Sequence, residues 1–265
     1  MPPSGLLGIV VATALGGARV LPVIWLVAPL GGPRLPGTVR VGFALLLALV
    51  ASPALVAAAG ADTLAALSVA RFTLLLGREI IVGLCLGLVA SAAFRAAEVA
   101  GRLGDTLRCA NVAEILVPTA EERASPLGVL YLLLATIVFL QIGGVPRLVD
   151  ALLSSYQTLP VWGGLGEVAT RHAALVVVAA SAKLLASGLA LAAPVVVALW
   201  LTDLALGLVA RAAPSVPVYF LGLPLKGLLA IGVVLLGLGT LQGALVSGFA
   251  GWFRLLAQAV AGLQG

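Results

Sequence analysis

Charged residues are scarce in this sequence. Only 9% of its 265 residues are Asp, Glu, Lys or Arg, whereas 62% are hydrophobic. A soluble domain of this size would carry charge at roughly a quarter of its positions. The composition therefore excludes an ordinary soluble domain, and it predicts a multi-pass membrane protein whose surface is covered by lipid or by other protein.

Residues that commonly carry chemistry are also scarce. His172 is the only histidine, which excludes a zinc site built from two or three histidines of this chain, and Cys85 and Cys109 lack the spacing of a metal site. The sequence has no phosphate-binding loop and no nucleophile elbow. The net charge is +5, but the arginines are scattered singly, which disfavours nucleic acid as a partner. We therefore predict a non-enzymatic protein without catalytic, cofactor-binding or metal-binding residues.

Long apolar runs organise the chain. Each is close to the 20 residues that cross a bilayer as a helix, and none alternates with the period of two of a barrel strand. The sequence therefore predicts an all-α membrane protein of about six long, partly broken hydrophobic helices in hairpins. The runs are residues 6–30, 41–61, 72–94, 127–145 and 173–201, and a last run that extends from residue 218 past residue 246.

Prolines fall in or near the interiors of four of these runs, at Pro22, Pro53, Pro194 and Pro224. Proline removes a backbone hydrogen bond and kinks a helix. These positions are either ordinary kinks, which membrane helices tolerate, or specific breaks that depend on assembly with other chains.

The third run contains an adjacent charged pair, Arg78 and Glu79. At the middle of an isolated membrane helix each charge would cost at least about 2.5 kcal/mol, so such groups persist where they meet a partner or a wet cavity. Glu79 lies on the same helical row as Gly83 and Gly87, where a neighbouring helix can approach closely and supply a donor. Adjacent helical residues point about 100° apart, so we do not expect Arg78 to be its main partner.

A second row of small residues in the last run also predicts a close helix contact. Its members are Gly239, Gly243, Ser247 and Gly251.

The connection after the third run is the most polar part of the chain. Arg95, Glu98, Arg102 and Asp105 recur at three and four residues and predict an amphipathic helix with a charged stripe. This stripe is either a solvated face with local salt bridges or a face that contacts partner subunits or a channel axis. Residues 118–126 are expected to end this region as a loop before the next span.

Two later connections carry further signals. Residues 146–170 contain Pro160 and a glycine cluster, which predict a structured hairpin loop. In residues 202–217, Asp203, Gly207 and Arg211 are spaced by four and share one helix face. Asp203 and Arg211 are about 12 Å apart along such a helix and cannot bond each other.

Several short motifs follow one another along the chain. They include Gly77-Arg-Glu-Ile-Ile-Val-Gly83, Phe94-x-x-x-Glu98-x-x-Gly101, Asp105-x-x-Arg108, Ser125-Pro126-Leu-Gly128, Ala193-Pro194, Asp203-x-x-x-Gly207-x-x-x-Arg211 and Leu223-Pro224-Leu-Lys226. This ordered set covers about residues 15 to 230 and resembles the FliR/SctT family of type III secretion export-apparatus proteins. Residues 119–126 resemble the injectisome branch, SctT, more than flagellar FliR.

The resemblance implies a non-enzymatic subunit of an export gate in the bacterial inner membrane. Such a subunit joins SctR-like (FliP-like) and SctS-like (FliQ-like) partners in a helical complex through which unfolded proteins pass. Further implied partners are an SctU/FlhB-like switch protein, an SctV/FlhA-like export protein and membrane lipid. Residues 1–265 would form one subunit, with residues 1–170 SctR/FliP-like and residues 171–265 SctS/FliQ-like plus a tail. The surroundings of the buried charges would then be other subunits.

The resemblance also suggests which residues act in assembly or gating. These candidates are Arg78, Glu79, Gly83, Gly87, Glu98, Arg102, Asp105, Arg108, Pro194, Asp203, Arg211 and Lys226. One departure concerns Leu107-Arg108-Cys109, where the family often has Gln-Arg-Gly.

The competing hypothesis is a proton-coupled secondary transporter of a small solute. In that case Glu79, Lys183 and Asp203 would be intramembrane relay or substrate groups. The two halves of the sequence show no convincing repetition, and the charged stripe has no evident role in such a transporter. Both observations favour the export gate.

Overall fold

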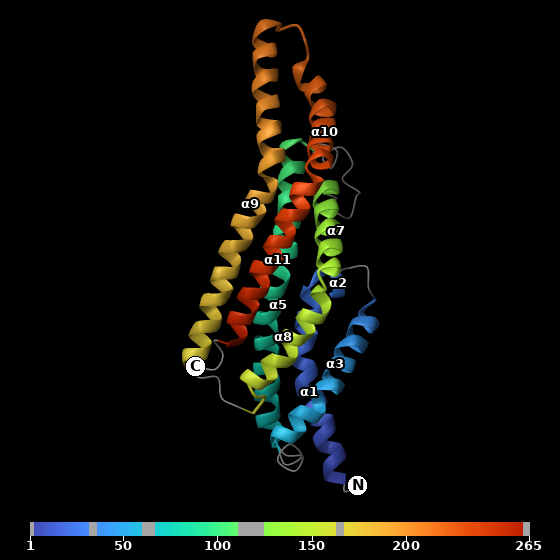
Figure 1. The fold of residues 1–265 in the computed structure, drawn as a ribbon, viewed down its shortest axis with the longest axis vertical. Coiled ribbons are helices and arrows are strands. Elements are labelled where there is room, and N and C mark those ends of the chain that lie inside the picture. The colour runs from blue at the N-terminus through green and yellow to red at the C-terminus, as the bar shows by residue number, and fades with distance from the viewer. Residues whose placement is uncertain (1–2, 32–35, 60–66, 111–124, 163–166, 262–265) are drawn as a thin grey trace. The chain divides into compact units, whose positions relative to one another are not determined.

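The computed structural model describes residues 3–31, 36–59, 67–110, 125–162 and 167–261 as a set of helices, and these residues contain no strand (Figure 1). The expectation of an all-α chain is confirmed. The helices are α1 (Pro3–Leu26), α2 (Ala28–Gly31), α3 (Gly37–Ala59), α5 (Val69–Leu107), α7 (Pro126–Gln141), α8 (Gly144–Thr158), α9 (Glu167–Ala212), α10 (Val218–Leu236) and α11 (Leu238–Ala261).

Six of the described helices are long and apolar enough to cross a membrane. The sequence also predicts six spans, but the two sets of six do not contain the same segments. The predicted span at residues 127–145 is wrong as a single straight helix, because α7 ends after 16 residues and the chain bends by 75° into α8. If α7 and α8 cross the membrane together, the pair is a seventh span. The last predicted run is two helices, which meet at Gly237.

The bend between α7 and α8 occurs at Gly143, whose φ of 69° is in the left-handed region that favours glycine. The hairpin loop predicted after this point is wrong over most of its length, since α8 occupies Gly144–Thr158. Leu148, Leu152 and Tyr156 are spaced by four and form its buried face. Pro146 is tolerated because it lies in the first turn, where backbone N–H groups have no intrahelical partner.

The prolines do not interrupt the helices. Pro22, Pro53, Pro194 and Pro224 all lie inside continuous helices, α1, α3, α9 and α10 respectively. The breaks in the described part of the chain fall at other positions, including Gly143 and Gly237. These prolines are thus accommodated within helices, which is the ordinary behaviour of membrane helices.

The predicted amphipathic helix is not a separate element. Its residues continue the third apolar run as the last three turns of the 39-residue helix α5. In the same way α9 continues beyond its apolar run to Ala212, so that Asp203, Gly207 and Arg211 lie on one helix as expected. The loop predicted at residues 118–126 lies outside the described residues except for Ser125 and Pro126, which are the N-cap and the first residue of α7.

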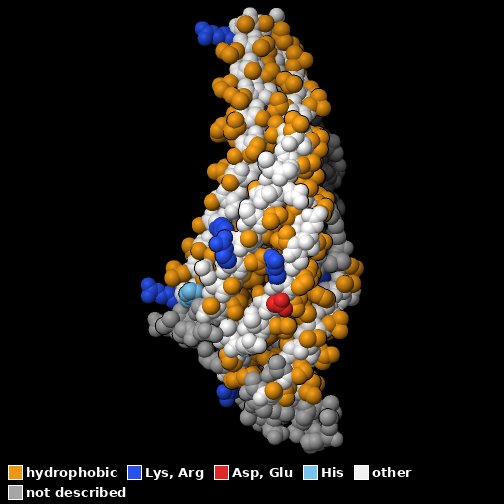
Figure 2. Space-filling view, viewed as in Figure 1, with side chains coloured by type: hydrophobic (Ala, Val, Ile, Leu, Met, Phe, Trp, Pro, Cys, Tyr) orange, Lys and Arg blue, Asp and Glu red, His pale blue; other side chains and the backbone are white. Residues whose placement is uncertain are grey.

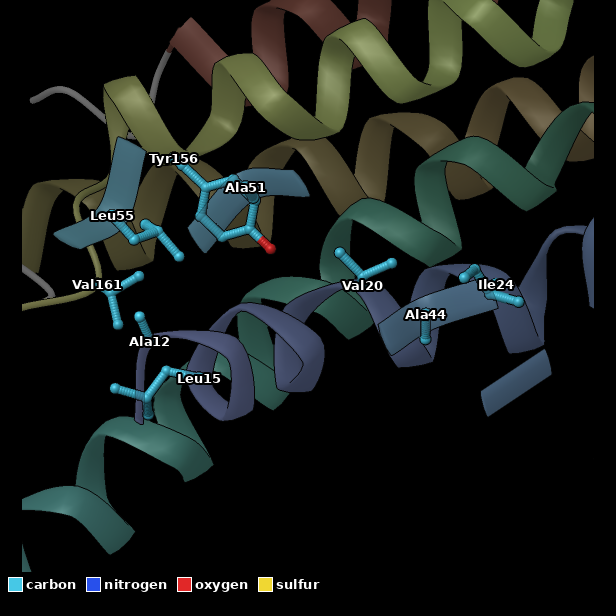
Figure 3. Close-up of a cluster of buried hydrophobic side chains, with 9 residues drawn as sticks. All are labelled: Ala12, Leu15, Val20, Ile24, Ala44, Ala51, Leu55, Tyr156 and Val161. Carbon is cyan, nitrogen blue, oxygen red and sulfur yellow. The ribbon is translucent and has the colours of Figure 1, made fainter. Parts of the chain in front are cut away.

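The chain contains two compact units. The first consists of residues 1–92, 143–182 and 250–265, and the second of residues 93–142 and 183–249. In the first unit α1 packs on α3, and a buried cluster joins these helices to the segment around α8 (Figure 3). Its members are Ala12, Leu15, Val20, Ile24, Ala44, Ala51, Leu55, Tyr156 and Val161.

The core of the second unit contains three aromatic rings, Phe94 of α5, Phe139 of α7 and Phe249 of α11. Their centroids are 5.1 to 5.5 Å apart in tilted or edge-to-face arrangements. Such geometry suits the charge distribution of aromatic rings. These contacts hold three sequence-distant helices together in this unit.

Hydrophobic side chains are spread over the face seen in Figure 2, and few charged groups lie among them. A soluble protein rarely exposes continuous apolar surface on this scale. The surface therefore fits the membrane-protein class that the composition predicts.

Candidate functional site

A buried ion pair occupies the interior of the first unit. The Arg19 side chain of α1 and the Glu79 side chain of α5 are both fully buried, and Arg19 Nε donates to Glu79 Oε2 at 2.6 Å. Arg78 Nη1 lies 3.3 Å from Glu79 Oε1. The shorter contact belongs to Arg19, which agrees with the expectation that Arg78 is not the main partner of Glu79.

Arg19 also binds the end of α8. Its Nη1 donates to the carbonyl oxygen of Ser155 at 2.8 Å and to Ser155 Oγ at 3.2 Å, and its Nη2 donates to the carbonyl oxygen of Leu159 at 2.9 Å. The carbonyl groups at the C-terminal end of a helix carry partial negative charge, and that of Ser155 also accepts from the backbone N–H of Leu159 at 3.0 Å. The guanidinium group therefore adds positive charge and donors to the end of α8 while it pairs with Glu79.

Two further contacts fix this arrangement. The Arg19 guanidinium lies 4.4 Å from the centroid of the Tyr156 ring, and the Tyr156 hydroxyl donates to the carbonyl oxygen of Gly16 at 2.8 Å. Arg78 Nη1 donates to the carbonyl oxygens of Pro160 and Val161 at 2.9 and 2.7 Å. Both arginines thus hold the chain segment that follows α8 against α1 and α5. We call Arg19, Arg78, Glu79 and Ser155 the arginine–glutamate cluster.

Glycines allow α1 and α5 to approach closely enough for this cluster. A Cβ atom placed on Gly83 would overlap the backbone carbonyl of Arg19, and one on Gly87 would lie 3.1 Å from Val23 Cα. This confirms that the first row of small residues is a helix contact. The expectation that other subunits surround these charges is wrong for Glu79, because its donor, Arg19, comes from the same chain.

Sequence reasoning did not name Arg19 as a site residue. A usable signal was present, since Arg19 is a basic residue inside the first apolar run and Glu79 is an acidic residue inside the third. Opposite charges at membrane depth on two helices of one chain favour a pair between them. The carbonyl acceptors at the end of α8 gave no such signal, because residues 146–170 were expected to form a loop.

The charged stripe of α5 divides into two parts in the second unit. Glu98 accepts from Arg95 at 2.9 Å and from Arg102 at 2.6 Å, and both arginine side chains are more than half exposed. These local pairs match the solvated-face interpretation, although a partner subunit could still cover them. Surface pairs of this kind contribute only a few tenths of a kcal/mol each.

Asp105 does not belong to a solvated stripe. It is buried, and its Oδ2 accepts from the Ser125 hydroxyl at 2.6 Å and from the backbone N–H of Leu127 at 2.9 Å. Its Oδ1 accepts from Arg108 Nε at 2.6 Å. Ser125 is the N-cap of α7, so Asp105 holds the start of α7 on α5. Gly101 permits this approach, because a Cβ there would overlap the Leu127 carbonyl.

The remaining candidates lie on α9 and α10 in the second unit. Lys226 of α10 forms an ion pair with Oδ1 of Asp203 of α9; Lys226 is nearly buried, whereas the Asp203 side chain is 46% exposed. Sequence spacing excluded an Asp203–Arg211 bond but did not identify Lys226 as the partner. Arg211 lies exposed in the last turn of α9, and Pro194 lies exposed within it.

The second row of small residues is open in this chain. Within the described residues, a Cβ on Gly239 or Gly243 would meet no atom within 4 Å. The contact predicted there stays a prediction. The described part of the chain also holds no group of three or more His, Cys, Asp or Glu side chains that could bind a metal ion.

Comparison with known proteins connects this geometry to a family. The family model described as bacterial export proteins, family 1, matches residues 10–251. The chain is 36% identical to Yop proteins translocation protein T of Yersinia pestis over 157 residues, which cover 59% of this chain and 60% of the relative. It is 30% identical to flagellar biosynthetic protein FliR of Bacillus subtilis over 200 residues, which cover 75% of each chain.

A third relative is secretion system apparatus protein SsaT of Salmonella typhimurium, with 32% identity over 153 residues and 58% coverage of each chain. The higher identity to the Yop translocation protein than to FliR favours the injectisome branch. The family match covers both the arginine–glutamate cluster and the Asp105 cap. The chain is therefore a member of bacterial export proteins, family 1, the FliR/SctT family of type III secretion.

Proposed function

We propose that this protein is a non-enzymatic subunit of a type III secretion export gate in the bacterial inner membrane. With SctR-like and SctS-like partners it would form the entry channel for unfolded secreted proteins. An SctU-like switch protein and an SctV-like export protein would adjoin this complex. Residues 1–170 are proposed to correspond to the SctR-like part and residues 171–265 to the SctS-like part.

The observation that carries this proposal is the length of apolar surface on α9. Large hydrophobic side chains are exposed on this helix from Leu175 to Val209. At 1.5 Å per residue, this stretch measures about 51 Å along the helix axis. The hydrocarbon core of a bilayer is only about 30 Å thick.

Tilt of α9 in the membrane does not bring the length of its exposed apolar stretch down to the thickness of the hydrocarbon core. Membrane helices tilt by at most about 40°, at which angle the exposed stretch of α9 would still span about 39 Å. Apolar surface therefore remains outside the hydrocarbon core if α9 stands alone. Other protein subunits can cover this surface, as an assembled gate requires. A solitary carrier would leave it in water.

The arginine–glutamate cluster also favours a structural subunit over a proton-coupled transporter. Glu79 is fully buried, and both of its oxygens already face guanidinium groups. Arg19 and Arg78 enclose this carboxylate between α1 and α5, whereas the relay group of a transporter must be reached from a polar path during each cycle. The geometry therefore gives Glu79 the role of a fixed connection between α1 and α5.

Mild detergent extraction of the tagged full chain from cells that express the secretion system tests the proposal. Native mass measurement should show a stoichiometric complex that contains SctR-like and SctS-like subunits. Deletion of the gene should abolish secretion, and the full chain should restore it. A monodisperse monomer that transports a small solute in vesicles would refute the export-gate function.

A further inference from the structure

One face of α9 combines charge, exposure and a small residue in the second unit. Asp203, Gly207 and Arg211 are spaced by four residues, and all three are exposed. A Cβ on Gly207 would meet no atom within 4 Å in the described part of the chain. We call these three residues the α9 row.

The α9 row borders the surface that packs against α10 and touches α10 through the ion pair between Asp203 and Lys226. The packed side is marked by Leu206, whose Cδ1 would lie 2.8 Å from a Cβ on Gly222 of α10. Leu206 precedes Gly207 by one residue, and adjacent helical residues point about 100° apart. Gly207 therefore lies off the packed side, and both Gly207 and Arg211 stay exposed beside the α9–α10 contact.

Large apolar side chains border the α9 row. Trp200, Leu204 and Leu208 are each more than half exposed, and they lie within one or two turns of Gly207 on the adjoining side of the helix. Gly207 is thus a notch between bulky side chains, where another helix can come close to the backbone. A lipid-facing surface has no need for such a notch, because lipid chains pack equally well on leucine.

The charges at the two ends of the row define what can occupy it. Lys226 pairs with Oδ1 of the Asp203 carboxylate, and the Asp203 side chain remains 46% exposed. No hydrogen bond or ion pair is formed by the Arg211 side chain within the described residues. An apolar helix packed on the notch would remove Arg211 from water without a counter-charge, and it would also desolvate the exposed part of the Asp203 carboxylate beside its pair with Lys226. An occupant with the reverse order of charges would compensate both.

We propose that the α9 row binds a membrane helix of another subunit. That helix carries a basic side chain opposite Asp203, a small residue opposite Gly207 and an acidic side chain opposite Arg211. Because Asp203 and Arg211 are about 12 Å apart along α9, the basic and acidic residues of the partner lie about two helical turns apart. This inference rests on the proposed function, and it names one contact that would hold the subunit in the gate.

Photo-crosslinking in the full, assembled system tests the proposal. A photoreactive phenylalanine analogue replaces Trp200, beside the row, or Ala205, which is exposed on another side of α9. The Trp200 position should form a covalent product with one subunit of the secretion system, whose crosslinked helix shows the basic–small–acidic order. A crosslinked helix without this charge order, or crosslinking of Trp200 to lipid only, overturns the proposal.

Substitutions then test the charges and the notch. Arg211→Glu should lower recovery of the crosslinked subunit about tenfold or more, since juxtaposed like charges disfavour association strongly. Arg171→Glu, at an exposed position near the start of the same helix, should leave recovery unchanged. Gly207→Leu fills the notch and should also lower recovery of the crosslinked subunit. Ala205→Leu is its control and should leave recovery unchanged. Equal recovery for each variant and its control overturns the proposal.

A charge exchange provides the decisive comparison. The acidic residue of the partner helix is replaced by Arg. This change should restore recovery of the crosslinked subunit with the Arg211→Glu variant, and it should not restore it with the Gly207→Leu variant. Extraction yield and a single symmetrical size-exclusion peak confirm that each variant is folded. If the parent chain forms a complex and none of these substitutions affects it, the export-gate function stands and the α9 row contact is refuted. A parent chain that captures no subunit refutes both.

Discussion

Removal of the Glu79 carboxylate tests how the arginine–glutamate cluster stabilises the protein. In Glu79→Leu, the fully buried Arg19 loses its 2.6 Å ion pair and keeps only carbonyl and hydroxyl acceptors of α8. Arg78 loses its weaker contact in the same step. Two guanidinium groups would then share a buried site without a carboxylate.

The expected cost follows from the burial of the pair. Removal of one partner from a buried ion pair costs about 3 to 5 kcal/mol, because the remaining charge stays buried without compensation. Glu79→Gln keeps the shape and one acceptor oxygen, so it should be the mildest change. Glu79→Ala should be worse, and Glu79→Leu at least as damaging as Ala, because leucine also blocks access of water to the guanidinium groups.

Glu98→Leu is the matched control, because Glu98 lies on the same helix and also contacts two arginines. Those arginines are exposed and remain solvated, so the control should cost less than about 1 kcal/mol. Denaturant titration of purified protein in one detergent gives the free energy of unfolding of each variant. Equal values for Glu79→Leu and Glu98→Leu would refute the inference that the buried carboxylate holds the cluster.

Three further substitutions test helix contacts and caps by the same measurement. Gly83→Ala should destabilise the chain, because its Cβ would overlap the Arg19 carbonyl. Gly77→Ala is the control and should be neutral or slightly stabilising, because no atom lies within 4 Å of its Cβ. Equal effects of the two substitutions would contradict the close approach of α1 and α5. Cys109→Gly should raise the free energy of unfolding by about 1 kcal/mol, since Cys109 has a φ of 59° at the end of α5 and glycine adopts this conformation without strain. A lower free energy of unfolding would contradict the strain inferred for Cys109. Asp105→Ala should lower the free energy of unfolding more than Ser125→Ala, because Asp105 accepts three hydrogen bonds while buried. Ser125→Ala removes a helix cap worth about 1 kcal/mol. The reverse order would contradict the role of Asp105 at the start of α7.

The departure at Cys109 shows how sequence and structure inform each other. Cys109 stands where the sequence resemblance predicts glycine, and the structure places this residue in the left-handed region. The backbone N–H of Ala110 donates to the carbonyl oxygen of Asp105 at 3.0 Å, and that of Cys109 donates to Thr106 at 3.1 Å. This pattern closes a helix with a left-handed residue, which explains why glycine suits the position.

Several features could be predicted from the sequence because they depend on local chemistry. The scarcity of charge required a membrane or protein environment, and the length of the apolar runs required helices, since backbone groups in lipid must be bonded within the segment. The spacing of Glu79, Gly83 and Gly87 predicted a packed face. The positions of the helix ends were harder to predict, because apolar runs continue smoothly through the breaks at Gly143 and Gly237.

Only the tertiary structure decided which groups meet. Arg19 and Glu79 are 60 residues apart, and Asp203 and Lys226 belong to different helices, so no local spacing relates them. The same holds for Asp105, which belongs to the charged stripe by its spacing but is buried because α7 begins against it. Composition and periodicity determined that this chain forms membrane helices with small-residue contact faces. The pairing of buried charges depended on which helices pack together, because a buried charge is stable only where folding brings an opposite charge or a free helix end to it.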